Sequence, residues 1–148
     1  MMCARSASEN TDRFNLQRFV DAQTPIFQRV TSELKAGRKM SHWMWFIFPQ
    51  IHGLGNSPTA IEYAISGLEE AHAYLAHPVL GPRLKECTQL VLTIENSSAA
   101  QVFGSPDDIK FRSCMTLFAQ VSEEGNTFTR ALEKYFRGIP DRMTLDRL

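Results

Sequence analysis

Four prolines mark the beginnings of amphipathic segments, and this pattern constrains the fold more than any other feature of the sequence. Proline suits the first turn of a helix because the N–H group that it lacks would have no partner there. Behind each of these prolines, apolar residues recur every three or four positions, which is the spacing of one helix face. The sequence therefore predicts helices that begin near Pro25, Pro58, Pro82 and Pro106.

Other segments repeat the helical spacing, whereas strand signals are nearly absent. Apolar residues at helical intervals also follow Gly67 and Asn126. The one candidate strand is Trp43–Phe48, which is isolated and does not alternate cleanly between polar and apolar residues. We therefore expect an all-α fold, a compact multi-helix bundle with a central aromatic-rich loop and at most a minor strand.

Length and composition indicate one globular domain. A chain of 148 residues, 43% of them hydrophobic and 22% charged, can bury a core of its own. No internal repeat, low-complexity tract or linker divides it. The first residues are small and polar and show no period. We therefore predict a flexible leader over residues 1–11 and a single helical domain over residues 12–148.

The charge balance and the cysteines argue against several classes of protein. Sixteen basic and sixteen acidic residues leave no net charge to attract nucleic acid or an anionic membrane. The longest apolar run, Trp43–Pro49, is too short to span a bilayer, and the N-terminus lacks the apolar core of a signal peptide. Cys3, Cys87 and Cys114 are widely spaced and odd in number, which favours reduced thiols. We expect a cytoplasmic protein that uses no metal or other cofactor.

We expect the functional site in the segment Gly37–Asn56, which holds both tryptophans and two of the four histidines. The helices on either side have caps and apolar faces of their own, so packing explains some of the aromatic residues but not the basic and polar ones beside them. An indole can stack on a planar ligand, and a basic side chain can bind the phosphate or carboxylate of that ligand. The predicted ligand-binding residues are Arg38, Lys39, Trp43, Trp45, Gln50 and, from a later helix, Lys110.

Two residues are candidates for acid–base chemistry. His42 lies within the segment, and an imidazole titrates near neutral pH. Glu62 is the nearest carboxylate that could stabilise oxocarbenium character or activate a water molecule. The alternative interpretation is that the aromatic residues form the centre of the core, because large aromatic side chains dominate core burial, and that His42 is structural.

Five motifs carry a resemblance to a known family. They are Gly37-Arg38-Lys39, Ser41–Gln50, Gly53-Leu54-Gly55, His77–Gly81 and Ser113–Phe118. In this order they resemble the bacterial DUF1810 family, from about Arg18 to Leu148. The resemblance implies a small, mostly helical protein without an established activity. Some members carry the label calpastatin, but the inhibitory repeats of calpastatin are disordered and this chain has the composition of a packed domain.

A second set of residues is similar to a more remote group. The set is Phe46–Pro49, Gly55, Ser57, Glu62-Tyr63, Pro78–Gly81, Lys110 and Met115. Its order is similar to that of the YbiA-like NADAR superfamily, whose members bind or cleave ADP-ribose-type N-glycosides. This resemblance implies a nucleotide-like ligand and a catalytic acid at Glu62, although this sequence has Tyr63 where a histidine is expected.

Two functions remain open at this point. The first is a pocket that binds a nucleotide or ADP-ribose-like metabolite between the central loop and the helix of Lys110, with cleavage of an N-glycosidic bond as its reaction. The second is a non-catalytic module whose aromatic loop docks a partner protein or a second copy of the chain, forming a homodimer. Convergence of Arg38, Lys39, His42 and Glu62 in a concave site supports the first function. A flat aromatic patch across a two-fold axis supports the second.

Overall fold

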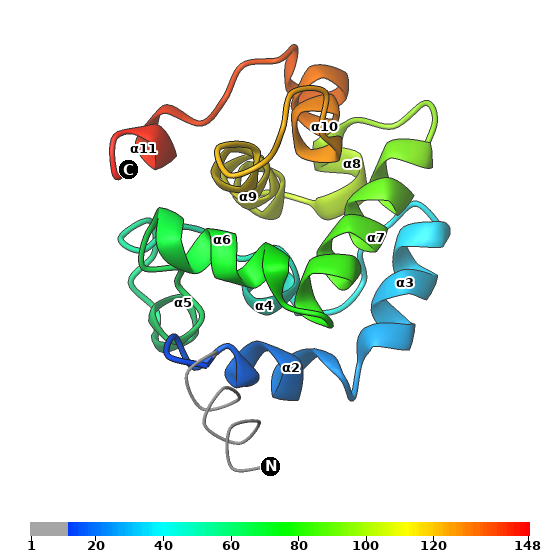
Figure 1. Cartoon of the computed structure of the whole chain (residues 1–148). Coiled ribbons are helices and arrows are strands. Elements are labelled where there is room, and N and C mark those ends of the chain that lie inside the picture. Colours follow the sequence, from blue (N-terminus) through cyan, green and yellow to red (C-terminus); the bar gives the residue numbers. More distant parts are fainter. Residues whose placement is uncertain (1–11) are drawn as a thin grey trace.

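The computed structural model describes residues 12–148, so the leader predicted for residues 1–11 lies outside the described part of the chain. Residues 12–148 fold into helices joined by loops (Figure 1). The helices are α2 (Gln17–Gln23), α3 (Phe27–Lys35), α4 (Met44–Ile47), α5 (Pro58–Glu62), α6 (Leu68–Ala76), α7 (Leu80–Thr93), α8 (Ala99–Phe103), α9 (Asp107–Ala119), α10 (Thr127–Phe136) and α11 (Arg142–Leu145).

The all-α prediction is confirmed, and the candidate strand at Trp43–Phe48 does not form. The run Trp43–Phe48 forms α4, a single helical turn with two buried side chains. A lone strand has no neighbour for its backbone N–H and C=O groups, whereas a helical turn pairs them within the segment. Within residues 12–148, the extended pairing amounts to one isolated parallel bridge between Ile51 and Ile65.

All four prolines lie at or near a helix start. The Ser57 side chain caps α5 and Pro58 is the first residue of that helix, as predicted. Pro25 lies just before α3, Pro82 lies in the first turn of α7, and Pro106 is the N-cap residue of α9. Local signals therefore locate these helix starts to within a few residues.

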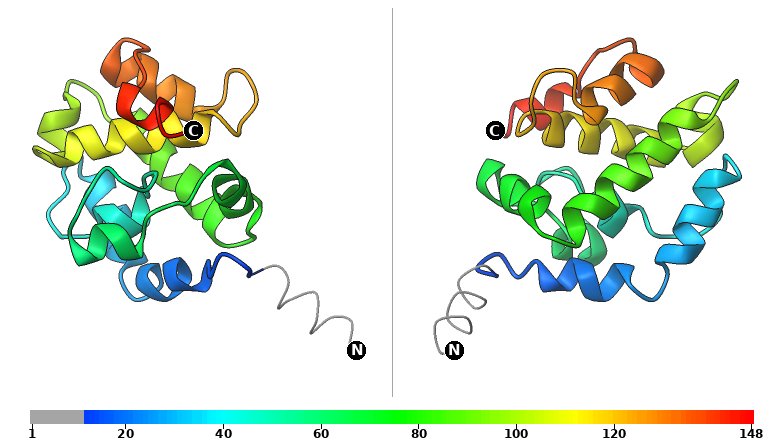
Figure 2. Two further views of the ribbon diagram at one scale, coloured as in Figure 1. Left: turned by 90° about the vertical axis from the view of Figure 1, so that its left-hand side faces the viewer. Right: turned by 45° about the vertical axis from the view of Figure 1, so that its right-hand side comes forward.

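The helices α7 and α9 are central to the packing. α9 contacts α4, α6, α8, α10 and α11, while α7 contacts α3, α6 and α10. Figures 1 and 2 show α2 along one side of the molecule and α10 along the opposite side. α9 thus has one side in the core, with Phe111 and Phe118 buried, and another side at the surface, where Ile109 is exposed.

Aromatic side chains fill the core beside α9. The Phe48 ring meets the rings of Phe103 and Phe111 edge-on, with centroids 5.8 and 5.0 Å apart, and Phe103 stacks on Phe111 at 4.6 Å. Trp43 is fully buried, and its ring centroid lies 6.2 Å from that of Phe48. Such pairs contribute roughly 0.5–1.5 kcal/mol each beyond the burial of their area. For Trp43 and Phe48, the structure shows the aromatic core that the alternative interpretation describes.

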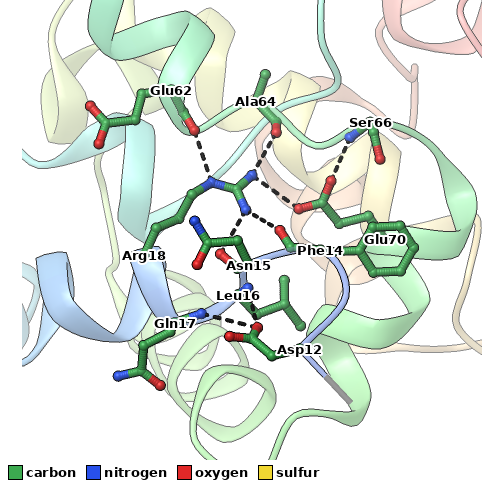
Figure 3. Close-up of polar contacts among 10 residues, drawn as sticks. All are labelled: Asp12, Phe14, Asn15, Leu16, Gln17, Arg18, Glu62, Ala64, Ser66 and Glu70. Carbon is green, nitrogen blue, oxygen red and sulfur yellow. Dashed lines mark hydrogen bonds and ion pairs between the residues drawn. The ribbon is translucent and has the colours of Figure 1, made fainter. Parts of the chain in front are cut away.

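A partly buried guanidinium ties α2 to the segment that follows α5 (Figure 3). Arg18 donates through Nε to the carbonyl oxygen of Glu62 at 2.8 Å and through Nη2 to that of Ala64 at 2.9 Å. The same Nη2 lies 3.0 Å from Oε2 of the buried Glu70. The backbone on both sides of Tyr63 is therefore fixed by one side chain.

Candidate functional site

A pocket of about 290 Å³ lies between α4, α5, α9 and α11. The left-hand view of Figure 2 shows α9 and α11 above the loop that leads to α5. The polar and aromatic side chains of its lining are Trp45, Gln50, Tyr63, Lys110, Ser113 and Asp141. Exposed apolar side chains, Ile109 and Met143, also belong to the lining. The pocket therefore combines flat, charged, hydroxyl-bearing and apolar groups.

Glycines shape the loop that forms one wall of the pocket. Gly53 has a φ of +89°, and a Cβ atom there would overlap with the guanidinium group of Arg147. A Cβ atom at Gly55 would lie 2.9 Å from the Cβ of Ala60. Because glycine has no side chain, the loop lies closely against both α5 and the C-terminal segment.

Lys110 forms the basic end of the pocket, and it pairs with Asp107, which also pairs with Lys39; the latter two residues lie outside the lining. Lys110 Nζ lies 4.2 Å from the centre of the Trp45 ring and 3.4 Å from Oδ1 of Asp107. The other oxygen of Asp107 lies 2.8 Å from Nζ of Lys39, whose side chain is only 7% exposed. Two ammonium groups thus share one carboxylate, which leaves one positive charge in excess among these three side chains.

The carboxylate of Asp141 forms a polar wall beside α9. Its Oδ2 accepts hydrogen bonds from the Ser113 hydroxyl at 3.1 Å and from the Thr144 hydroxyl and backbone N–H at 2.6 and 3.0 Å. Arg112 fixes the segment before α11 by donating through Nε to the Ile139 carbonyl at 2.9 Å. These contacts hold α11 against α9 and give the Asp141 carboxylate one orientation.

Tyr63 supplies a second aromatic ring and a hydroxyl group. Its ring meets that of Phe46 edge-on, with centroids 5.4 Å apart. Burial raises the pKa of the Tyr63 phenol, and the neighbouring carboxylate of Glu62 raises it further. The phenol is therefore neutral at physiological pH, and Tyr63 belongs to the lining of the pocket.

Three of the predicted ligand-binding residues come together in this pocket. Trp45, Gln50 and Lys110 all belong to its lining, although Lys110 lies far from the other two in the sequence. Lys39 is one ion pair away, because it shares Asp107 with Lys110. The structure therefore brings together one aromatic, one amide and one basic residue of the predicted site.

The other predicted residues do not belong to the pocket lining. Trp43 is fully buried, so its ring cannot stack on a ligand. Arg38 and His42 are exposed outside the pocket. Glu62 is exposed as well. Its backbone carbonyl accepts a hydrogen bond from Arg18, and Figure 3 shows its carboxylate turned away from that guanidinium group. The predicted convergence of Arg38, His42 and Glu62 in one pocket is thus corrected by the structure.

A buried carboxylate, Glu33, explains this correction. Its Oε1 accepts hydrogen bonds from the backbone N–H groups of Met40 at 2.7 Å and Ser41 at 3.0 Å. The Trp43 indole N–H bonds to Oε1 at 3.0 Å, and the Ser41 hydroxyl bonds to Oε2 at 2.6 Å. Burial raises the pKa of Glu33, but these hydrogen bonds lower it by more, so the pKa lies below its usual value. The stretch Arg38–His42 is therefore folded around Glu33 and not around the pocket.

Sequence reasoning missed Tyr63, Ser113 and Asp141 as site residues. Asp141 has the local pattern of a helix cap, and it does cap α11. Ser113 follows Lys110 by three positions, which places both on one face of α9, so the spacing was a usable signal. Nothing local to residue 141 indicates that α11 packs beside that face.

A larger groove of about 990 Å³ lies between the α6–α7 region and the segment before α10. Its charged side chains are of both signs, including Lys85, Glu86, Glu123 and Glu124. It contains none of the predicted site residues, and Phe128 is the one phenylalanine, tyrosine or tryptophan in its lining. We therefore place the candidate site in the smaller pocket, despite the greater volume of the groove.

Residues 12–148 contain neither a cluster suited to a metal ion nor a helix suited to crossing a membrane. No cluster of three or more histidine, cysteine, aspartate or glutamate side chains in this part of the chain is arranged to hold a metal ion. Among the helices described, none combines the length and the apolar character needed to cross a bilayer.

Comparisons with known proteins identify the family. The sequence matches the model described as "Protein of unknown function (DUF1810)" over residues 13–148. The fold is similar to the crystal structure of a conserved hypothetical protein from Mycobacterium tuberculosis, with a TM-score of 0.91 and 53% sequence identity. That match covers 93% of this chain and 98% of the other. No curated protein matches the sequence. The chain therefore belongs to the DUF1810 family, as its motifs indicated.

Proposed function

We propose that the pocket binds an anionic, ring-containing metabolite of the nucleotide class. The observation that carries this proposal is the position of Lys110 Nζ, 4.2 Å from the centre of the Trp45 ring in the lining of the pocket. A cation beside an aromatic wall offers a ligand both a charge and a flat surface. A nucleotide carries the matching groups, because it joins a phosphate to an aromatic base.

The charges around Lys110 support an anionic ligand. Lys39 and Lys110 share the carboxylate of Asp107, so positive charge is present before any ligand binds. The Lys39 side chain is nearly buried, and charges that are removed from solvent are screened less by salt. A phosphate beside Lys110 would therefore also be attracted by Lys39.

We extend the proposal to hydrolysis of an N-glycosidic bond. The bond between the anomeric carbon and the base nitrogen breaks and the base leaves with that electron pair, while a water oxygen bonds to the carbon and releases its proton to the leaving base or to solvent. This reaction needs a carboxylate near the anomeric carbon, where it stabilises an oxocarbenium-like transition state. Among the described residues that line the pocket, Asp141 is the only carboxylate, so we assign to it the role predicted for Glu62. The likeness of the sequence to the NADAR superfamily supports the same class of substrate.

The alternative is a docking module that uses the aromatic loop, and it has less support. Trp43 is fully buried and Trp45 is partly covered, so the loop does not present two exposed indoles. The exposed apolar side chains of the site are Ile109 and Met143. Sedimentation analysis tests this alternative, which predicts a dimer that Met143→Ser dissociates.

A thermal-shift experiment tests the binding proposal. AMP, NAD and ADP-ribose are added to the parent protein and to Lys110→Gln, with Lys35→Gln on an exposed site of α3 as the matched control. A ligand of the native state must raise the melting temperature, so we expect a rise in the parent and the control but not in Lys110→Gln. The proposal fails if none of the three compounds raises the melting temperature, or if Lys110→Gln responds as the parent does. Release of nicotinamide from NAD, followed by chromatography, tests the reaction.

A further inference from the structure

We propose that the pocket recognises the ribose phosphate part of its ligand, with the phosphate at Lys110 and the ribose hydroxyls at Asp141. This inference rests on the proposed function and specifies its ligand class. It assigns opposite ends of one small molecule to two groups of opposite charge in one pocket.

The first step of the argument is the spacing of the two groups. Lys110 and Ser113 are three residues apart on α9, so their Cβ atoms lie roughly 5–6 Å from each other on one helix face. The Ser113 hydroxyl lies 3.1 Å from Oδ2 of Asp141. The ammonium group and the carboxylate therefore line the same wall, within the reach of a single sugar phosphate.

The second step is the way in which Asp141 uses its oxygens. Within residues 12–148, the three hydrogen bonds to this carboxylate all end on Oδ2, and two of their donors come from Thr144. An ionised carboxylate accepts up to about four hydrogen bonds, shared between its two oxygens. We therefore assign Oδ1 to the ligand. The negative charge of Oδ1 would repel a phosphate, whereas a ribose hydroxyl can donate a hydrogen bond to Oδ1. The orientation of the ligand in the pocket is therefore fixed.

The third step is the size of the pocket. A volume of about 290 Å³ lies at the lower end of the range of roughly 300–1,000 Å³ that ligand pockets span. It suits one sugar phosphate better than a complete dinucleotide. The remainder of a larger ligand would lie at the mouth, against Ile109 and Met143, whose side chains are 56% and 58% exposed.

Titration calorimetry with four probes tests this assignment on the parent protein. The probes are AMP, ribose 5-phosphate, adenosine and 2′,3′-dideoxy-AMP. We expect AMP and ribose 5-phosphate to bind, and adenosine and the dideoxy compound to bind at least about tenfold more weakly than AMP, because each lacks one of the two recognised ends. Equal binding of AMP and dideoxy-AMP overturns the inference but leaves the proposed function standing. Equal binding of AMP and adenosine overturns both, because Lys110 would then not recognise a negative charge. If no probe binds, both proposals fail.

A conservative variant then assigns the hydroxyl end to one residue. Asparagine caps helices as well as aspartate does, so Asp141→Asn is expected to fold. In this variant AMP should bind about as weakly as dideoxy-AMP binds to the parent, while the affinity for dideoxy-AMP stays the same. Asp146→Asn is the matched control on the same segment, since Asp146 pairs with Arg142 on the surface. A full preference for AMP in Asp141→Asn would overturn the assignment, and the comparison of probes on the parent stands even if the variant does not fold.

Discussion

The surroundings of Glu33 and Asp141 are two regions in which one carboxylate organises its neighbours, but the two residues use their oxygens differently. Both oxygens of Glu33 accept hydrogen bonds, three on Oε1 and one on Oε2. The hydrogen bonds that Asp141 accepts within residues 12–148 all end on one oxygen, and the residue lines the pocket. An ionised carboxylate accepts about four hydrogen bonds, so the four that Glu33 accepts leave it no room for a ligand, whereas Asp141 is held in place and its Oδ1 can still accept a donor.

This difference explains why Arg38–His42, the first part of the segment in which we expected the site, does not line the pocket. The donors of Met40, Ser41 and Trp43 point inward to Glu33, and the stretch between them closes into a compact turn. Polar residues that serve the fold and polar residues that serve a ligand look alike in a sequence. Their partners distinguish them, and the partners lie elsewhere in the chain.

The largest expected effect is that of removing Glu33. Glu33→Ala leaves the buried indole N–H of Trp43 and the backbone N–H groups of the turn without their charged acceptor, so we expect a loss of about 3 kcal/mol in the free energy of unfolding. Urea denaturation measures it. The control is Glu95→Ala at an exposed site, which should cost less than about 0.5 kcal/mol. A loss below about 1 kcal/mol for Glu33→Ala would show that Glu33 is not the support described here.

Removal of the Asp141 carboxylate should reduce stability less than removal of Glu33 does, and it should reduce ligand affinity more. Asp141→Ala removes the cap of α11 and the acceptor of the Ser113 hydroxyl, which corresponds to about 1–2 kcal/mol in the free energy of unfolding. The response of the melting temperature to AMP should disappear in the same variant. If Asp141→Ala unfolds as readily as Glu33→Ala, the two carboxylates have the same structural role and the comparison is wrong.

The free energy of unfolding should depend on pH through Glu33. The pKa of Glu33 is lowered in the folded state relative to its usual value of 4.5, so the unfolded chain takes up the proton first as the pH falls. The stability that Glu33 contributes is therefore complete above pH 4.5 and is lost as the pH falls through the lowered pKa. Glu33→Gln should be less stable than the parent near neutral pH, and its stability should decline less steeply below pH 4.5. Parallel declines in the two proteins, measured by urea denaturation at several pH values, would contradict this.

The smallest expected effect is that of His42. Its side chain is exposed and does not line the pocket, so His42→Ala should change the free energy of unfolding by less than about 0.5 kcal/mol. The melting temperature of the variant should also rise with AMP as much as that of the parent. A lost response to AMP would instead restore the site that the sequence suggested and would move the ligand toward the turn around Glu33.

The helices were predictable because their signals are local. Pro58 with Ser57, and the apolar spacing behind each proline, depend on neighbours a few residues away. The run Trp43–Phe48 shows the limit of such signals, since a short aromatic run fits a strand or a helical turn equally well until its partners are known.

The site was predictable only where it lies close to unusual residues. Trp45 and Gln50, which line the pocket, were predicted because they belong to the aromatic segment, and Lys110, which lines it too, was predicted in part from the resemblance to a more remote superfamily. Asp141 was not found, because it reaches the pocket only when α11 packs against α9. Glu33 was not recognised as the organiser of the turn because glutamate is usually a surface residue.

The guanidinium of Arg18 links the first helix described to the wall of the pocket. It donates to the carbonyl groups of Glu62 and Ala64, which flank Tyr63 in the sequence, and Tyr63 and Ala64 line the pocket. The same hydrogen bonds therefore hold α2 in place and position the wall that a ligand would contact. Thermodynamic linkage is reciprocal, so a bound nucleotide should slow amide hydrogen exchange in α2. Local unfolding of α2 should in turn lower the affinity of the pocket for the nucleotide.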